Sequence, residues 1–104
     1  MEFAELREQA RAVRARYDEL ERQRCGRSWN HEEIMLGFLG DVGDLSKLVQ
    51  AKAGIRPTAD LDRALAHELA DCLWSVLVLA DCYDIDLQAA FTDTMRELTE
   101  RLAR

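Results

Sequence analysis

The chain has 104 residues, of which 48% are hydrophobic and 33% charged, and its formal net charge is -6. These proportions are typical of one soluble globular domain, here residues 1–104, and the acidic balance argues against a partner that is a nucleic-acid polymer. No apolar run reaches the roughly 18 residues of a membrane span, and the charged N-terminus does not resemble a signal peptide. We therefore expect a soluble protein without a membrane partner.

The first two predicted segments are helical, because the chain has one Pro and five Gly and is rich in Ala, Leu, Glu and Arg. The first helix is expected over residues 2–24, with Gly26 placed to end it. The second is expected over about residues 31–53. Asn30 is a suitable N-cap for it, and Glu33 is in the position of a capping-box partner. Glu33 is therefore predicted to be structural.

The next segment, about residues 60–83, is predicted to be a helix that is apolar around most of its circumference. Such a helix must be covered on several sides. A fourth helix follows over about residues 87–103, with Asp86 as its N-cap. Four helices with short connections predict an all-α antiparallel four-helix bundle.

The breadth of this apolar surface predicts self-association. If one chain left the third helix uncovered, its exposed patch would exceed what monomers usually tolerate. The side chains expected in that patch are Leu73, Trp74, Leu77 and Val78. Since two-fold pairing is the commonest solution, we expect a homo-oligomer in which the second and third helices of one subunit pack on those of another.

Two features near the second helix each allow two interpretations. Trp29, in the preceding loop, either plugs the end of the bundle or stacks on a nucleobase. Gly37, Gly40 and Gly43 form a smooth strip on a helix that pays roughly 1 kcal/mol for each of them. Either another helix or a ligand approaches this strip.

Three cysteines, Cys25, Cys72 and Cys82, include no CxxC pair. An odd number without metal-ligand spacing favours reduced thiols over disulfides or a zinc site. The sequence therefore predicts a cytoplasmic protein.

Two acidic pairs at a spacing of three lie on the second and third predicted helices: Asp41 with Asp44, and Glu68 with Asp71. Residues three apart share one helix face. If the helices pack antiparallel about a turn near residue 56, Asp44 and Glu68 each lie 12 residues from the turn, and Asp41 and Asp71 each lie 15. The two pairs are therefore level and can converge on one point.

Four carboxylates at one point would repel one another, and a hard divalent cation would relieve this. Carboxylate oxygens are the ligands that Mg²⁺ and Mn²⁺ prefer, and Mg²⁺ often shares its coordination shell with substrate phosphates. This indicates a nucleotide or another polyphosphate. The competing interpretation is that these are ordinary surface acids paired with Arg. His67 is expected to point away from the shared face and to lie on the surface.

The stretches GDVGDLSKLVQAK (40–52) and HELADCLWSVLVLADCYDIDL (67–87) resemble the two signature helices of MazG-like nucleotide pyrophosphohydrolases. This family belongs to the all-α NTP pyrophosphatase superfamily, near the dCTP pyrophosphatases. Its pattern is E-x-x-E, a spacer, and E-x-x-D. Asp41 and Asp44 match the first pair, and Glu68 and Asp71 match the second. The resemblance covers about residues 34–91.

The resemblance implies a four-helix MazG-like bundle that forms a homodimer or homotetramer. It also implies hydrolysis of a nucleoside triphosphate to the monophosphate and pyrophosphate, with Mg²⁺ or Mn²⁺ as cofactor, in house-cleaning of the nucleotide pool. The four matched carboxylates would hold the metal, and Asp41 or Asp44 would act as general base. Lys52 matches a basic residue near the phosphates, and Trp29 is the candidate for the base.

Two departures from the family pattern favour a second hypothesis. The first acidic pair has Asp where the family usually has Glu, so each carboxylate is one methylene shorter. Thr94 and Leu98 stand where many relatives carry Lys and Asn. The alternative is a non-catalytic helical oligomer that binds a nucleotide or a metal as a sensor or interaction module.

Overall fold

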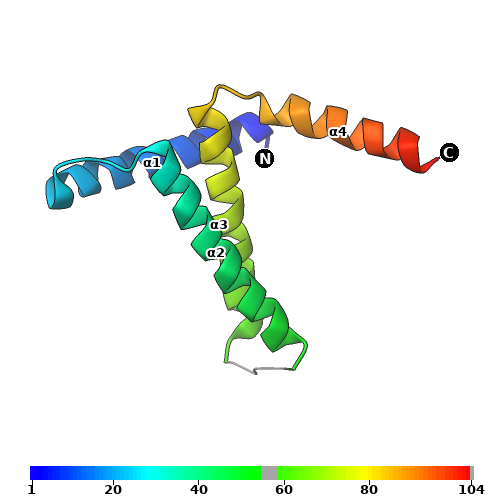
Figure 1. Cartoon of the computed structure of the whole chain (residues 1–104), viewed down its shortest axis with the longest axis horizontal. Coiled ribbons are helices and arrows are strands. Elements are labelled where there is room, and N and C mark those ends of the chain that lie inside the picture. Colours follow the sequence, from blue (N-terminus) through cyan, green and yellow to red (C-terminus); the bar gives the residue numbers. More distant parts are fainter. Residues whose placement is uncertain (55–58, 104) are drawn as a thin grey trace.

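The computed structural model describes residues 1–54 and 59–103, which contain four α-helices and no strand (Figure 1). The helices are α1 (Phe3–Cys25), α2 (His31–Lys52), α3 (Leu61–Cys82) and α4 (Leu87–Leu102). This confirms the all-α class, and every predicted helix is correct to within one residue at each end. Among the described residues, no helix is long and apolar enough to cross a bilayer.

The sequence signals at the start of α2 act as predicted. Gly26 ends α1 with a φ of 79°, and its N–H donates to the carbonyl of Arg22. Asn30 and Glu33 form the capping box, each side chain accepting from the other's backbone N–H. Arg27 binds both oxygens of Glu33 and, with the Asn30 N–H, lowers the pKa of Glu33 to about 2. Glu33 is therefore structural.

α2 and α3 form an antiparallel hairpin, which is the main packing unit of the chain (Figure 1). Ile34 and Ala51 of α2 are buried, as are Ser75, Leu77 and Val78 of α3. Each fully buried Leu or Val side chain stabilises the fold by roughly 1.5–3 kcal/mol. The antiparallel hairpin is the arrangement that sets the two acidic pairs level.

α1 crosses the hairpin near the C-terminal end of α3 (Figure 1). Trp74 donates from Nε1 to the carbonyl of Ala10 at 3.2 Å and packs edge-on against Tyr17, with ring centroids 5.7 Å apart. Arg11 donates from Nε to Oδ1 of Asp81 at 2.8 Å. These contacts fix the position of α1 on α3.

The Arg11–Asp81 pair should make the docking of α1 sensitive to acid. Hydrogen bonds from Arg11 lower the pKa of Asp81 below its usual 3.8. A depressed carboxyl pKa adds stability that is complete above about pH 4 and is lost as the pH falls through the folded-state value. We expect thermal unfolding measured from pH 7 to pH 2 to lose this contribution in the wild type, whereas Asp81→Asn is less stable at pH 7 and changes less.

The control for this experiment is Asp93→Asn, because the ion pair of Asp93 with Arg96 lies on the exposed surface of α4. Exposed pairs contribute little to stability. This variant should follow the wild-type curve. An acid profile for Asp81→Asn that parallels the wild type would contradict the role of the pair.

α4 projects away from the other helices, so one chain does not close the predicted four-helix bundle (Figure 1). Every residue of 88–103 is exposed, including the apolar stripe Phe91, Met95, Leu98 and Leu102. The Cα radius of gyration is 16.6 Å, against roughly 13 Å for a compact domain of about 100 residues. The helices are as predicted, but the stripe on α4 lacks a partner within the described chain.

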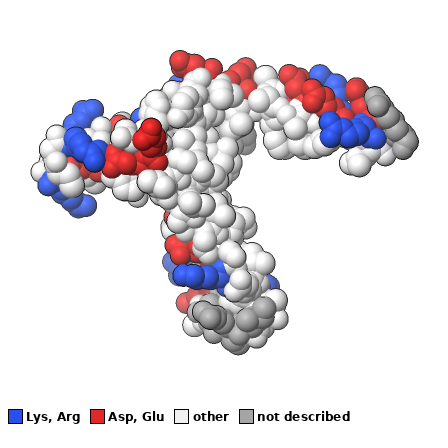
Figure 2. Space-filling view, viewed as in Figure 1, with Lys and Arg blue, Asp and Glu red and all other residues white. Residues whose placement is uncertain are grey.

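The apolar surface of the hairpin differs from the expected patch. Leu77 and Val78 are buried within the chain and Trp74 is half-buried, so only Leu73 of the four predicted residues is exposed. Exposed apolar residues lie instead on both helices, with Leu36 and Leu39 on α2 and Leu69 and Leu73 on α3. In the space-filling view, much of the upper part of the hairpin carries neither acidic nor basic side chains (Figure 2).

Candidate metal centre

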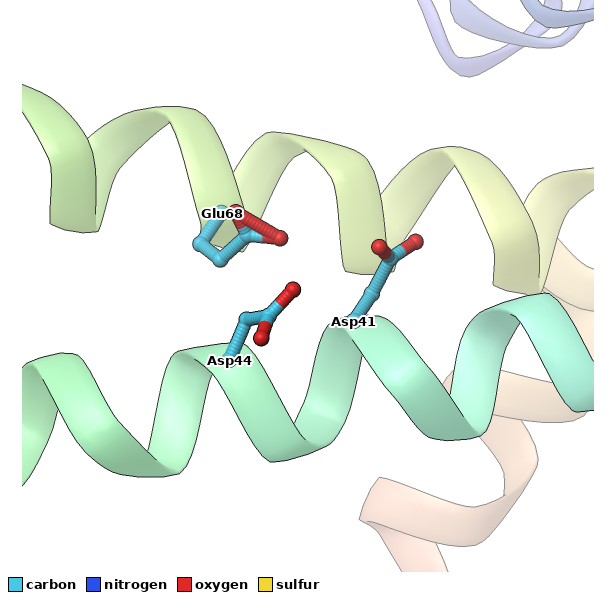
Figure 3. Close-up of side chains that lie close together, drawn as sticks. All are labelled: Asp41, Asp44 and Glu68. Carbon is cyan, nitrogen blue, oxygen red and sulfur yellow. The ribbon is translucent and has the colours of Figure 1, made fainter.

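Asp41 and Asp44 of α2 and Glu68 of α3 bring their carboxylates together midway along the hairpin (Figure 3). One oxygen from each lies within 4.8 Å of the other two. Asp41 and Glu68 are half-buried and Asp44 is exposed. We call these three residues the acidic cluster. The structure thus unites three of the four carboxylates that the sequence analysis selected.

Asp71, the fourth carboxylate, lies outside the acidic cluster and contacts a histidine. Its Oδ2 is 3.2 Å from Nε2 of His67, one turn earlier on α3. His67 is exposed as predicted, but the expectation that it points away from the face of Asp71 is wrong. His67 faces away from its sequence neighbour Glu68, but its i,i+4 relation to Asp71 places the side chains of His67 and Asp71 together.

The electrostatics of the acidic cluster are those of uncompensated negative charge. The pKa of Asp41 is raised, mainly by burial and to a smaller extent by the charges of Asp71 and Asp44. The pKa of Glu68 is also raised, mainly by burial and to a smaller extent by the charges of Asp71, Asp41 and Asp44. The same causes, burial and the neighbouring carboxylates, raise the pKa of the Cys72 thiol. Ionisation of these groups therefore costs the fold free energy.

No salt bridge between described residues involves any member of the acidic cluster. The interpretation as surface acids paired with Arg therefore has no support in that part of the chain. Three carboxylate oxygens that no basic side chain neutralises are suitable ligands for a hard divalent cation. The donor set contains no thiolate or imidazole, which structural zinc sites use.

A cavity of about 680 Å³ opens between α1, α2 and α3 beside the acidic cluster. We call it the α1 cavity. Asp41 belongs both to the acidic cluster and to its wall, and Asp71 also lines it. The wall further includes the aromatic residues Tyr17, Trp29, Phe38 and Trp74 and the polar residues Arg14, Asp18, Glu21 and Ser75. Its volume lies in the range of small-molecule sites, which are also mostly apolar with a few polar groups.

Trp29 explains one of the three glycines on α2. A Cβ atom added to Gly37 would lie 2.9 Å from Cζ3 of Trp29, so the indole ring packs where a side chain would be. At Gly40 and Gly43, no described atom lies within 4 Å of such a position. Trp29 is also 46% exposed and lines the α1 cavity. Trp29 therefore covers the end of α2 and keeps a surface open to a ligand.

Lys52 lies apart from the acidic cluster. Its Nζ is 2.5 Å from Oδ1 of Asp62 at the connector end of the hairpin, and it follows Asp44 by about 12 Å along the helix. Thr94 and Leu98 lie on α4, which projects away from the hairpin (Figure 1). Within one chain, none of these three residues reaches the carboxylates.

The polar part of the α1 cavity was missed by the sequence analysis. The sequence analysis did not select Arg14, Asp18 and Glu21, because charged residues on an amphipathic helix usually face solvent. They share one face at spacings of three and four. That periodicity was a usable signal, but only the crossing of α1 over the hairpin makes it the wall of a cavity.

The chain is all-α and sets carboxylates from two antiparallel helices against one another. The family model for the MazG nucleotide pyrophosphohydrolase domain matches residues 29–103, and the chain belongs to this family. The match includes α2, α3 and α4 with both acidic pairs, whereas α1 precedes it. No curated protein and no solved structure matches the chain.

Proposed function

We propose that the protein is a nucleoside triphosphate pyrophosphohydrolase that uses Mg²⁺, or Mn²⁺ in its place. The reaction converts a (d)NTP and water to the (d)NMP and pyrophosphate. The observation that carries this proposal is the acidic cluster, three carboxylates within 4.8 Å of one another, in a chain of the MazG family. Asp71 is the fourth member of the proposed ligand set, because its charge already acts on Asp41 and Glu68.

The proposed roles follow from which residues face the cluster and which face the cavity. A bound divalent cation would neutralise phosphate charge and lower the pKa of a water molecule. Asp41 or Asp44 would accept the proton of the attacking water. Asp41 is favoured, because it lies in both the cluster and the cavity wall and because its raised pKa is closer to the working pH.

The proposed substrate site is the α1 cavity, with Trp29 against the nucleobase. Lys52 would reach the phosphates only by leaving Asp62. Because α1 supplies one wall of the cavity and is tied to α3 through Trp74 and Arg11, we treat residues 1–104 as one functional domain.

The proposed working form is a homodimer or homotetramer, supported by the exposed apolar residues of the hairpin and of α4. Such an assembly could bring Thr94 and Leu98 of α4 close to the acidic cluster of another subunit. The free thiols of Cys25, Cys72 and Cys82 suit a role in house-cleaning of the cytoplasmic nucleotide pool.

The test is a panel of canonical and damaged ribo- and deoxyribonucleoside triphosphates, each incubated with pure protein and Mg²⁺ or Mn²⁺. We expect release of pyrophosphate and of the monophosphate in equal amounts, loss of both with a chelator, and recovery on addition of either metal. Release of orthophosphate instead would contradict the proposed bond cleavage. No product from any member of the panel would overturn the proposal.

One observation favours the alternative, a nucleotide- or metal-binding module without turnover. Lys52, which the resemblance places near the phosphates, is held by Asp62 at the end of the hairpin. Calorimetry would then detect nucleotide binding while the nucleotide stays intact over hours. Turnover that depends on added metal would exclude this alternative.

A further inference from the structure

The wall that α1 contributes to the α1 cavity contains a guanidinium and a carboxylate that form an ion pair but no hydrogen bond with each other. Arg14 and Asp18 are one turn apart and both line the cavity. Nε of Arg14 is buried and has no hydrogen-bond partner among the described residues. Oδ2 of Asp18 lies 3.9 Å from it, beyond hydrogen-bond distance. Their side chains are only 25% and 26% exposed.

Asp18 accepts no hydrogen bond from a described residue, and its partly exposed carboxylate lines the cavity, so it is available to a molecule bound there. Arg14 also donates from Nη1 to Sγ of Cys82 at 3.1 Å, which fixes the guanidinium in place. The other N–H groups on the two Nη atoms of Arg14 and the carboxylate of Asp18 have no hydrogen bond to a described residue. A molecule in the cavity could satisfy both with one polar edge.

Glu21 adds a second acceptor one turn further along α1. Its Oε1 accepts from the backbone N–H of Trp29 at 3.0 Å, and no other hydrogen bond between described residues ends on this carboxylate. The bond ties the Trp29 loop to α1, while the indole ring packs on Gly37. The aromatic rings of Tyr17 and Trp74 complete the apolar part of the wall. The cavity thus combines flat apolar surfaces with a polar edge dominated by acceptors.

We propose that this wall reads the nucleobase and selects bases that carry an exocyclic amino group, with Asp18 as the main specificity-determining residue. The proposal rests on the proposed function, because it names the substrate class of the same site. Aromatic side chains supply stacking, which every base can use. Selection therefore depends on the polar edge.

The preference follows from the hydrogen-bonding edges of the bases. Cytosine and adenine present an amino group beside a ring-nitrogen acceptor, which matches Asp18 beside Arg14. Guanine presents a ring N–H and an amino group side by side, next to a carbonyl oxygen. Uracil and thymine present one imide N–H between two carbonyl oxygens, and a carboxylate that approaches this N–H is repelled by both.

The experiment compares pairs of triphosphates that differ only at the hydrogen-bonding edge of the base. dCTP and dUTP differ by an amino group or a carbonyl at one ring carbon and by an acceptor or an N–H at the adjacent ring nitrogen, and dGTP and dITP differ only by the amino group of guanine. We expect kcat/KM to be at least about 10-fold higher for dCTP than for dUTP, with dGTP above dITP, since a hydrogen bond to a charged group is worth about this factor. In Asp18→Asn, whose amide can also donate, both ratios should fall toward one.

The matched control is Glu19→Gln, next to Asp18 but outside the α1 cavity, with its side chain exposed and paired with Arg16. This variant should keep the wild-type ratios. Thermal unfolding checks that each variant is folded, and Glu21→Gln replaces Asp18→Asn if the latter is not. Three results would overturn the inference while leaving the proposed function intact. They are equal rates for the paired substrates, a preference for dUTP, and ratios that Asp18→Asn leaves unchanged.

Binding of the monophosphates separates this inference from the reaction itself. If no triphosphate is hydrolysed, calorimetry with dCMP and dUMP still tests the wall. Tighter binding of dCMP that is lost in Asp18→Asn would support the inference although the pyrophosphohydrolase proposal had failed. Equal binding of the two, or binding of neither, would overturn it.

Discussion

Glu68→Gln is expected to lower kcat/KM for nucleotide hydrolysis by more than about 100-fold, because loss even of an outer-shell partner of a metal ligand costs about 10- to 100-fold. Glu68 is the only member of the acidic cluster that α3 supplies, so its loss leaves both remaining carboxylates on α2. The amide has nearly the same shape but no charge. The measurement is pyrophosphate release at several concentrations of Mg²⁺.

The same variant should be no less stable than the wild type when metal is absent. In the metal-free protein, ionised Glu68 is opposed by burial and by three nearby carboxylates, as its raised pKa indicates. Removing the charge relieves this repulsion. We expect the wild-type Tm to rise by several degrees on addition of Mg²⁺ or Mn²⁺, since a ligand that binds only the folded state stabilises it, and Glu68→Gln to lose most of this rise.

The control is Glu100→Gln, an equally conservative change on the exposed surface of α4, which should leave activity and the metal-induced shift unchanged. Glu68→Gln with normal turnover would remove Glu68 from the mechanism. A variant that is inactive and also unstable without metal would mean that Glu68 supports the fold instead.

Leu73→Glu is expected to weaken self-association by about 100-fold or more. Leu73 is 49% exposed on α3, although it lies on the most apolar helix of the chain. Burial of a Leu is worth about 1.5–3 kcal/mol, and a two-fold contact would bury it twice. The substitution removes that term from both subunits and adds a charge that must be desolvated.

Light scattering at low micromolar concentration is the measurement. The wild type should have at least twice the chain mass of 11.9 kDa, and Leu73→Glu should approach that mass. Ile85→Glu is the control, because Ile85 is equally exposed but lies in the turn between α3 and α4. Leu39→Glu on α2 serves if circular dichroism shows that Leu73→Glu is not helical. A folded wild-type monomer would defeat the proposed assembly.

Much of the fold was predictable because its signals are local. Asn30, Glu33 and Gly26 fix helix ends by bonds within a few residues, and these ends were correct to within one residue. The convergence of Asp41, Asp44 and Glu68 was also predictable, because counting from the turn of an antiparallel hairpin needs no tertiary information. The family was identified from the same residues.

The incorrect expectations concern directions in space that helical periodicity does not determine. The path of α4 follows the turn at Asp84, whose φ of 53° is acceptable for Asp but does not by itself fix the direction of the next helix. Leu77 was expected in an intersubunit patch, but its own chain buries it, because which side of an apolar helix faces the hairpin partner is decided by packing. The role of Lys52 near the phosphates stays a prediction, and its pairing with Asp62 across the end of the hairpin could not be predicted from helical spacing.

The acidic cluster and the polar wall of the α1 cavity come from different parts of the chain, and this has an evolutionary consequence. The acidic cluster lies on α2 and α3, whereas Arg14, Asp18 and Glu21 lie on α1, outside the residues that the family model matches. Substitutions on α1 can therefore alter which molecule is accepted without disturbing the carboxylates. A duplicated copy of such a gene could acquire a new substrate through a few changes in its first helix while the inherited chemistry stays intact.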